Sequence, residues 1–148
     1  MSAAIIAMDF SDALAALEDE CGRERLSYEC QERFLQLHLA WAEAAARENP
    51  EMSLVQFRAA EDCQRALAGY ATSHAEALAA TAALYEIMAR RASFLEKLAS
   101  NATSVVARLE RLHEARAVLL AVVDNGDGLG EAHRPDLERI EHKMRAFH

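Results

Sequence analysis

Residues 67–123 read LAGYATSHAEALAATAALYEIMARRASFLEKLASNATSVVARLERLHEARAVLLAVV. Apolar or small side chains recur in this stretch at alternating steps of three and four residues. That average repeat of about 3.5 residues is typical of helices packed lengthwise against one another, and no β-strand has it. We call this repeat the ladder; its members are Leu67, Tyr70, His74, Ala77, Thr81, Leu84, Met88, Arg91, Leu95, Leu98, Ala102, Val105, Leu109, Leu112, Arg116, Leu119 and Val123. The ladder predicts long helices that lie side by side.

The composition of the whole chain favours the same fold class. Only two prolines and five glycines interrupt the 148 residues, which is little punctuation for a β or α/β protein. A chain of this length can bury a core without disulfides or metals. We therefore predict an all-α fold, an elongated antiparallel up-and-down bundle with long helices and a short C-terminal helix, in a single domain of residues 1–148.

Four helices are expected, at about residues 10–48, 53–99, 103–123 and 135–147. We expect the first helix to continue past Gly22, and the alternative is a kink at that residue. The helix should end at Asn49-Pro50, because the helical conformation is disfavoured for a residue that precedes proline. Ser53 and Gln56 have the spacing of a capping box, which predicts the start of the second helix.

The second helix has one possible break. Gly69, followed by a second possible capping box of Ser73 and Glu76, allows the helix to stop and restart there. The ladder nevertheless keeps step across Gly69, so we favour one long helix from residue 53 to residue 99.

The segment from Ser100 to Ser104 is a second place where a helix could end. Its weak helix formers favour a turn, and the alternative is a helix that continues to Val123 and pairs with another chain. We favour the turn. The stretch Asp124–Gly130 is a stop signal, and Pro135 suits the first turn of a final helix.

The net charge of −8 restricts the kinds of partner. Nucleic acids and anionic membranes attract basic surfaces, so an acidic chain indicates protein partners instead. The apolar run near the N-terminus is too short for a membrane span and lacks a basic flank, which predicts a cytoplasmic protein. Abundant alanine and arginine hint at a GC-rich, bacterial genome.

The three cysteines are expected to be free thiols. Cys21 and Cys30 lie nine residues apart on what we predict to be one helix, so they would point in opposite directions and could neither bond nor share a metal. Cys63 then has no obvious partner. Buried or half-buried thiols in a reducing compartment are the simplest interpretation.

No motif for catalysis or metal binding stands out. The stretch Asp124–Gly128 resembles a calcium loop, but the register puts Val123 and Arg134 at ligand positions, so a surface loop is the better interpretation. Glu110 and His113 have the spacing of a di-iron site, but the second such pair that this site needs is missing. We predict no catalytic residue, no metal and no cofactor, and hence no enzyme.

Polar residues interrupt the ladder at His74, Thr81, Arg91 and Arg116. They lie either at the rim of a drifting apolar stripe or along a groove that a partner helix fills, where polar groups would set the register. The two chain ends carry short apolar stripes, which either pack on the bundle itself or bind a partner. The candidate partner-binding residues are Ile5, Ile6, Met8, Phe10, His74, Arg91, Arg116, Leu137, Ile140, Met144 and Phe147.

These observations favour a non-enzymatic bundle that binds another protein, as a cytosolic chaperone, adaptor or assembly factor. The chain is similar to bacterial secretion and flagellar export chaperones in size and charge, without a shared motif. One alternative is a structural protein whose long helices pair as a coiled-coil dimer. Another is a bundle that binds a small ligand or a metal.

Overall fold

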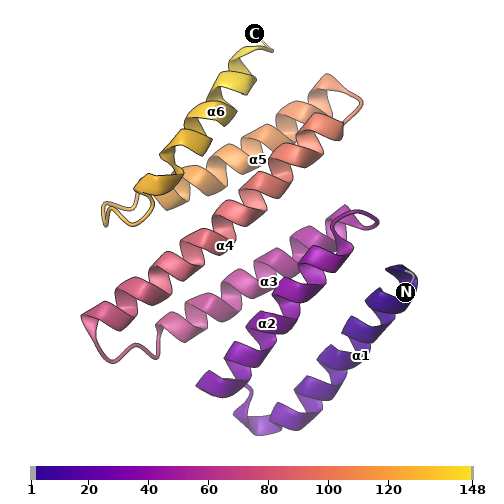
Figure 1. Cartoon of the computed structure of the whole chain (residues 1–148), viewed down its shortest axis with the longest axis vertical. Coiled ribbons are helices and arrows are strands. Elements are labelled where there is room, and N and C mark those ends of the chain that lie inside the picture. The colour runs from indigo at the N-terminus through magenta and orange to yellow at the C-terminus, as the bar shows by residue number, and fades with distance from the viewer. Residues whose placement is uncertain (1–2, 148) are drawn as a thin grey trace. The chain divides into compact units, whose positions relative to one another are not determined.

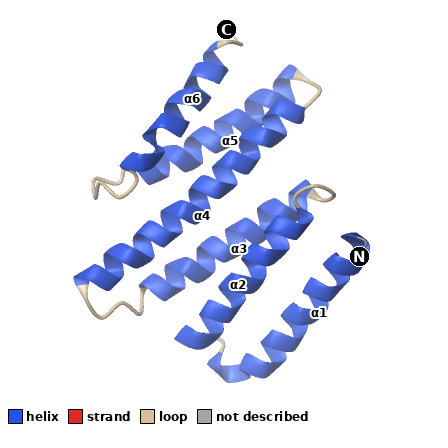
Figure 2. Cartoon of the chain, in the orientation of Figure 1, coloured by secondary structure: helices blue, strands red, loops and turns tan. Residues whose placement is uncertain are grey.

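A computed structural model describes the backbone of residues 3–147 and the side chains of residues 9–147. Within these residues the chain is helical and contains no strand, which confirms the all-α helical bundle (Figure 2). The helices are α1 (Ala3–Cys21), α2 (Tyr28–Ala45), α3 (Pro50–Ala68), α4 (His74–Asn101), α5 (Val105–Val123) and α6 (Arg134–Arg145), with short 3-10 turns at Gly22–Glu24 and Glu131–His133.

The chain divides into two compact units, and the boundary lies inside α4, between Leu84 and Tyr85. Unit 1 is residues 1–84 and unit 2 is residues 85–148. Within unit 1, α2 packs against both α1 and α3, and within unit 2, α5 packs against α6 (Figure 1). Short connections reverse the chain between successive helices of each unit. The single domain expected from the sequence stays a prediction.

The predicted helix over residues 10–48 is wrong, because the chain breaks after Cys21. Gly22 has a positive φ of 48°, a conformation that costs glycine little. Ser27 is extended and accepts a hydrogen bond from the backbone N–H of Cys30 at 3.2 Å, so it caps a new helix. Residues 22–27 therefore turn the chain, and α1 and α2 form a hairpin.

This turn also overturns the prediction of free thiols at Cys21 and Cys30. The two residues form a disulfide, with their Cα atoms 6.2 Å apart. The expected opposite orientation assumed one continuous helix, whereas the turn brings the end of α1 to the start of α2. Cys63 is free and buried, as expected, and burial raises the pKa of its thiol to about 11.

The predicted helix over residues 53–99 is also interrupted. The chain leaves the helix at Gly69 and restarts at His74, where Ser73 accepts a hydrogen bond from the backbone N–H of Glu76 at 3.1 Å. The alternating spacing of three and four residues that defines the ladder continues across this loop only by coincidence. Its members Tyr70 and His74 are exposed, so they do not belong to a buried seam.

The capping box predicted at Ser53 is wrong as well. Pro50 occupies the first turn of α3, and Asn49 caps it by accepting from the backbone N–H of Met52 at 3.2 Å. Ser53 therefore falls inside the helix and is fully buried. Its hydroxyl donates to the carbonyl of Ala42 at 2.7 Å and so joins α3 to α2.

Unit 2 follows the sequence prediction more closely. The turn favoured at Ser100–Ser104 is confirmed, and Ser104 caps α5 by accepting from the N–H of Ala107 at 3.1 Å. The helix α5 ends at Val123, as expected. In the loop that follows, Asp127 accepts hydrogen bonds from the hydroxyl of Tyr85 at 2.7 Å and from the N–H of Leu129 at 3.0 Å, so this loop is tied to α4.

Replacing Gly130 by alanine is expected to lower the free energy of unfolding by about 2 kcal/mol. Gly130 is buried, and a Cβ atom there would overlap the carbonyl oxygen of Val122 and lie 2.6 Å from its carbonyl carbon. Chemical denaturation measures the effect. In Gly69→Ala the new Cβ would lie 3.2 Å from the Ala66 oxygen, so this control should change stability by less than about 1 kcal/mol. Equal effects of the two substitutions would contradict the prediction.

Candidate functional site

Unit 1 has two concave surfaces of similar size: a hollow of about 650 Å³ between α1 and α2, and a groove of about 640 Å³ that also carries two exposed aromatic rings. The groove lies between the N-terminal half of α2, the end of α3, the loop after α3 and the first turns of α4. We call it the tyrosine groove, and it is lined by Tyr28, Glu32, Leu35, Gln36, Gln64, Leu67, Tyr70, Ala71, Thr72, Glu76, Ala79 and Ala80.

Two tyrosines form one wall of the groove. Tyr28 is 52% exposed and Tyr70 is 44% exposed, and their rings meet edge to face with centroids 5.8 Å apart. The hydroxyl of Tyr70 donates a hydrogen bond to the backbone carbonyl of Leu26, a third exposed apolar residue. Exposed apolar residues gathered beside a concave surface are typical of interaction sites.

The floor of the groove is apolar and held in place. Leu35 and Leu67 are buried beneath it. The side-chain amide of Gln64, also buried, donates to the carbonyl of Ala80 at 3.0 Å and so joins α3 to the first turns of α4. This bond fixes α3 and α4 to each other beside the floor, and ligand sites in proteins are usually formed in this way before the ligand binds.

The charge of the groove is negative. Glu76 accepts from both the N–H and the hydroxyl of Thr72 at 2.7 Å, and these bonds lower the pKa of its carboxyl, which keeps it ionised. The side chain of Glu32 forms no hydrogen bond or ion pair within the described residues. None of the described lining residues is basic, so two carboxylates dominate the electrostatics.

The turn over residues 22–27 contacts the tyrosine wall through Leu26, whose carbonyl accepts the hydrogen bond from Tyr70. It is held by the Cys21–Cys30 disulfide, and the side-chain amide of Gln31 donates to the carbonyl of Arg25 at 2.8 Å. The bond from Tyr70 to Leu26 attaches the turn to the loop after α3. The position of the wall therefore depends on how well this turn is fixed.

The N-terminal candidates from the sequence are only partly placed. Ile5, Ile6 and Met8 belong to α1, but their side chains lie outside the described residues. Phe10 stacks on the buried ring of Trp41, with centroids 6.0 Å apart, so it packs within unit 1. His74 is exposed at the start of α4 and does not line the groove.

The candidates in unit 2 are largely engaged. Leu137 and Ile140 are core residues, and the guanidinium of Arg116 pairs with Glu141 at 3.2 Å. Met144 is half-buried, and Phe147 lines a groove of about 350 Å³ at the end of α6. Arg91 is half-buried in α4. All of these residues belong to unit 2, whereas the lining of the tyrosine groove belongs to unit 1.

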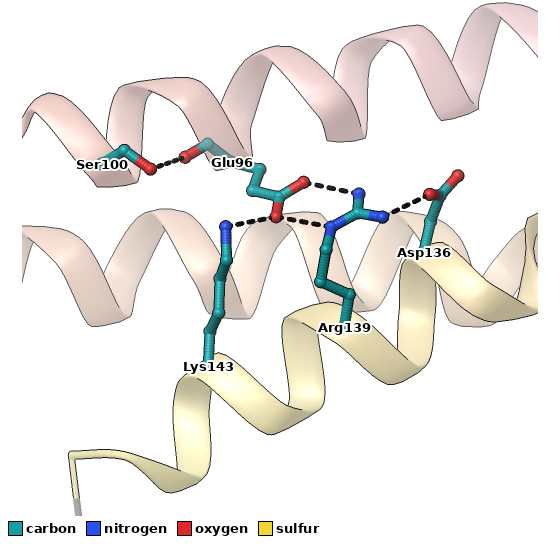
Figure 3. Close-up of polar contacts among 5 residues, drawn as sticks. All are labelled: Glu96, Ser100, Asp136, Arg139 and Lys143. Carbon is teal, nitrogen blue, oxygen red and sulfur yellow. Dashed lines mark hydrogen bonds and ion pairs between the residues drawn. The ribbon is translucent and has the colours of Figure 1, made fainter.

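The strongest polar cluster of unit 2 centres on Glu96 of α4. Its side chain is 10% exposed. The carboxylate accepts hydrogen bonds from the guanidinium of Arg139 at 2.8 and 2.9 Å and from the ammonium group of Lys143 at 2.6 Å. Figure 3 shows both basic side chains reaching from α6 to this carboxylate, and Asp136 bound to the far side of Arg139. Hydrogen bonds from Arg139 lead the causes that lower the pKa of Glu96 to about 2. Both carboxylate oxygens are occupied, so the cluster joins α6 to α4 rather than awaiting a ligand.

The sequence patterns that resemble di-iron and calcium sites do not form a metal site among the described residues. No group of three or more histidine, cysteine or acidic side chains in this part of the chain could hold a metal ion. Glu110 and His113 are both exposed on α5. In the loop after α5, the carboxylate of Asp127 is already bound by Tyr85 and Leu129.

Sequence reasoning missed the tyrosine groove because Tyr28 falls inside the predicted helix over residues 10–48 and Tyr70 belongs to the ladder. The signal that points to it is the pair of helix breaks beside them, Gly22 and Gly69.

None of the described helices combines the length and the apolar character that a bilayer crossing requires. Comparison of the chain with protein-family models, with curated proteins and with solved structures gives no match.

Proposed function

We propose that this protein is a non-enzymatic helical bundle that binds another protein in the tyrosine groove, as a chaperone, adaptor or assembly factor. The observation that carries the proposal is the pair of half-exposed rings, Tyr28 and Tyr70, beside a preformed apolar floor. Tyrosine is enriched at protein interfaces, where its ring supplies contact area and its hydroxyl finds a polar partner.

The shape of the groove supports a segment of protein as the ligand. Grooves between helices commonly accept an amphipathic helix or an extended strand whose side chains enter at regular spacing. A volume of about 640 Å³ holds several side chains of such a segment. The net charge of −8 keeps the free protein soluble and disfavours nucleic acid as the partner.

We propose the bacterial cytoplasm as the location. In that compartment thiol reductants act on disulfides, so the Cys21–Cys30 bond would be subject to reduction there. The state of this bond would then depend on the thiol reductants of the cell.

The double variant Tyr28→Ala/Tyr70→Ala is expected to lower partner affinity by about 30-fold, because buried tyrosine anchors dominate many interfaces. A photoreactive residue at Gln36, in the groove, would first capture the partner from the native host for identification by mass spectrometry. Calorimetry with the purified partner then gives the affinities of the wild type and the variant.

Val55→Ala is the matched control, because Val55 is 57% exposed on α3 of the same unit and does not line the groove. It should leave the affinity unchanged. Unchanged binding by the double variant, with its helical content intact by circular dichroism, would refute the proposal. A crosslink from residue 36 to a second copy of the chain, with a doubled mass in light scattering, would replace it by self-association.

A further inference from the structure

We infer that the tyrosine groove binds a basic side chain, arginine or lysine, presented by the partner protein. This inference rests on the proposed function and adds the chemistry of the ligand. Three properties of the groove carry it: exposed aromatic rings, two carboxylates without a basic neighbour in the lining, and an apolar floor.

The aromatic wall provides the first part of a cation site. A guanidinium or ammonium group over a tyrosine ring is attracted by the electron density of the ring face, and the attraction grows as water is excluded. Tyr28 and Tyr70 meet edge to face, and about half of each side chain remains exposed. Ring surface is therefore left over for a ligand after the two tyrosines have packed on each other.

The carboxylates provide the second part. The side chain of Glu32 is free of partners within the described residues, so an incoming cation would not have to break an existing ion pair. Glu76 accepts two hydrogen bonds from Thr72, and no basic side chain among the described lining residues neutralises its charge. A partner's carboxylate or phosphate would meet two like charges, which costs free energy at close range.

The neighbouring surface does not cancel this charge. Arg33, on the α1 side of α2, is held by the carboxylate of Glu20 at 2.8 and 3.1 Å, and it does not line the groove. The nearest described arginine of α2 is therefore already paired. The groove keeps its negative character.

The floor explains why a long basic side chain fits better than a small cation. Arginine and lysine lay their methylene stems on apolar surface and keep the charged end at a polar rim. Leu35, Leu67 and Ala79 offer the apolar surface, and Glu32 and Glu76 offer the polar groups. A bare metal ion would leave that floor unused.

The test uses the full chain, labelled with ¹⁵N and with its disulfide intact, and four matched pentapeptides as probes. The parent probe is acetyl-Ala-Leu-Arg-Leu-Ala-amide, and the others carry lysine, citrulline or norleucine at the central position. Citrulline keeps the shape of arginine without its charge. We expect the arginine and lysine probes to shift the amide signals of Tyr70, Ala71 and Glu32, and to bind about 5-fold more tightly than the citrulline probe.

The matched variants are Glu32→Gln and Glu29→Gln. Glu29 is exposed one turn away on α2 and does not line the groove. Glu32→Gln should weaken the arginine probe about 3-fold, whereas Glu29→Gln should leave its affinity unchanged. Equal effects of the two variants, or a shift pattern that leaves residues 70–72 untouched, would overturn the inference.

The outcome also separates this inference from the proposed function. If the norleucine probe binds as tightly as the arginine probe, the groove prefers neutral apolar side chains, which overturns the cationic ligand and leaves protein binding intact. If no probe binds and Tyr28→Ala/Tyr70→Ala also retains the natural partner, both proposals fail.

Discussion

Replacing Glu96 by glutamine is expected to destabilise unit 2 by about 3 kcal/mol at neutral pH. The substitution removes the charge that Arg139 and Lys143 share, while their own charges remain beside a largely buried amide. Because these two basic side chains are 47% and 42% exposed, water screens part of the loss, and the cost falls at the lower end of the range for buried pairs. Hydrogen exchange of the α6 amides measures the local free energy of opening.

The same substitution should change how unit 2 responds to acid. Folding lowers the pKa of Glu96 from 4.5 to about 2, so the stability that the ionised carboxylate contributes is fully present above pH 4.5. It is lost as the pH falls from about 4.5 towards about 2, where the folded protein also takes up the proton. The difference between wild type and Glu96→Gln should therefore shrink towards zero over this interval.

Glu110→Gln is the control for both measurements, because Glu110 is an exposed glutamate of α5 in the same unit. Its effect should stay within about 0.5 kcal/mol at every pH. A constant difference between wild type and Glu96→Gln from neutral pH to pH 2 would show that the carboxylate contributes through packing rather than charge.

Reducing the disulfide should release the end of α1 from the start of α2. Joining Cys21 to Cys30 closes a loop of about ten residues, and the chain-entropy model gives such a bond about 2.5 kcal/mol of stabilisation. Hydrogen exchange of the α1 amides is expected to accelerate accordingly when a phosphine reductant is added. Because the same turn carries Leu26, which Tyr70 binds, reduction should also weaken binding in the tyrosine groove.

Two variants make this second test specific. Cys21→Ser/Cys30→Ser should show fast α1 exchange from the start and no response to the reductant. Cys63→Ala should respond as the wild type does, because Cys63 is free. Three reactive thiols in unfolded protein that was purified without reductant would rule out the bond and this prediction with it.

The ladder predicted the fold class because burial along a helix leaves a period that no strand shares. The turn at Ser100–Ser104 was predicted from its weak helix formers, because the ladder itself continues through this segment. The ladder could not locate the helix breaks at Gly22 and Gly69, because a period reports which residues share a face and not whether the backbone between them is continuous. A glycine inside a helix and a glycine that ends one look alike in sequence.

The candidate site was harder to predict than the fold. The tyrosine groove combines residues from α2, α3 and α4, and its exposed rings at positions 28 and 70 look like core residues when each is read along its own helix. The C-terminal apolar stripe supplies Leu137 and Ile140 to the core of unit 2, which is one of the two roles that its sequence allows. Exposure depends on which neighbours a helix meets, and a single sequence does not contain that information.

The Cys21–Cys30 bond has a consequence for proteolysis. Arg23 and Arg25 are exposed in the turn that this bond encloses, so trypsin has access to both sites. A cut there opens the backbone but leaves the two fragments joined through sulfur. Under oxidising conditions a nicked molecule would thus migrate as one chain on a gel, and the N-terminal fragment would separate only after reduction.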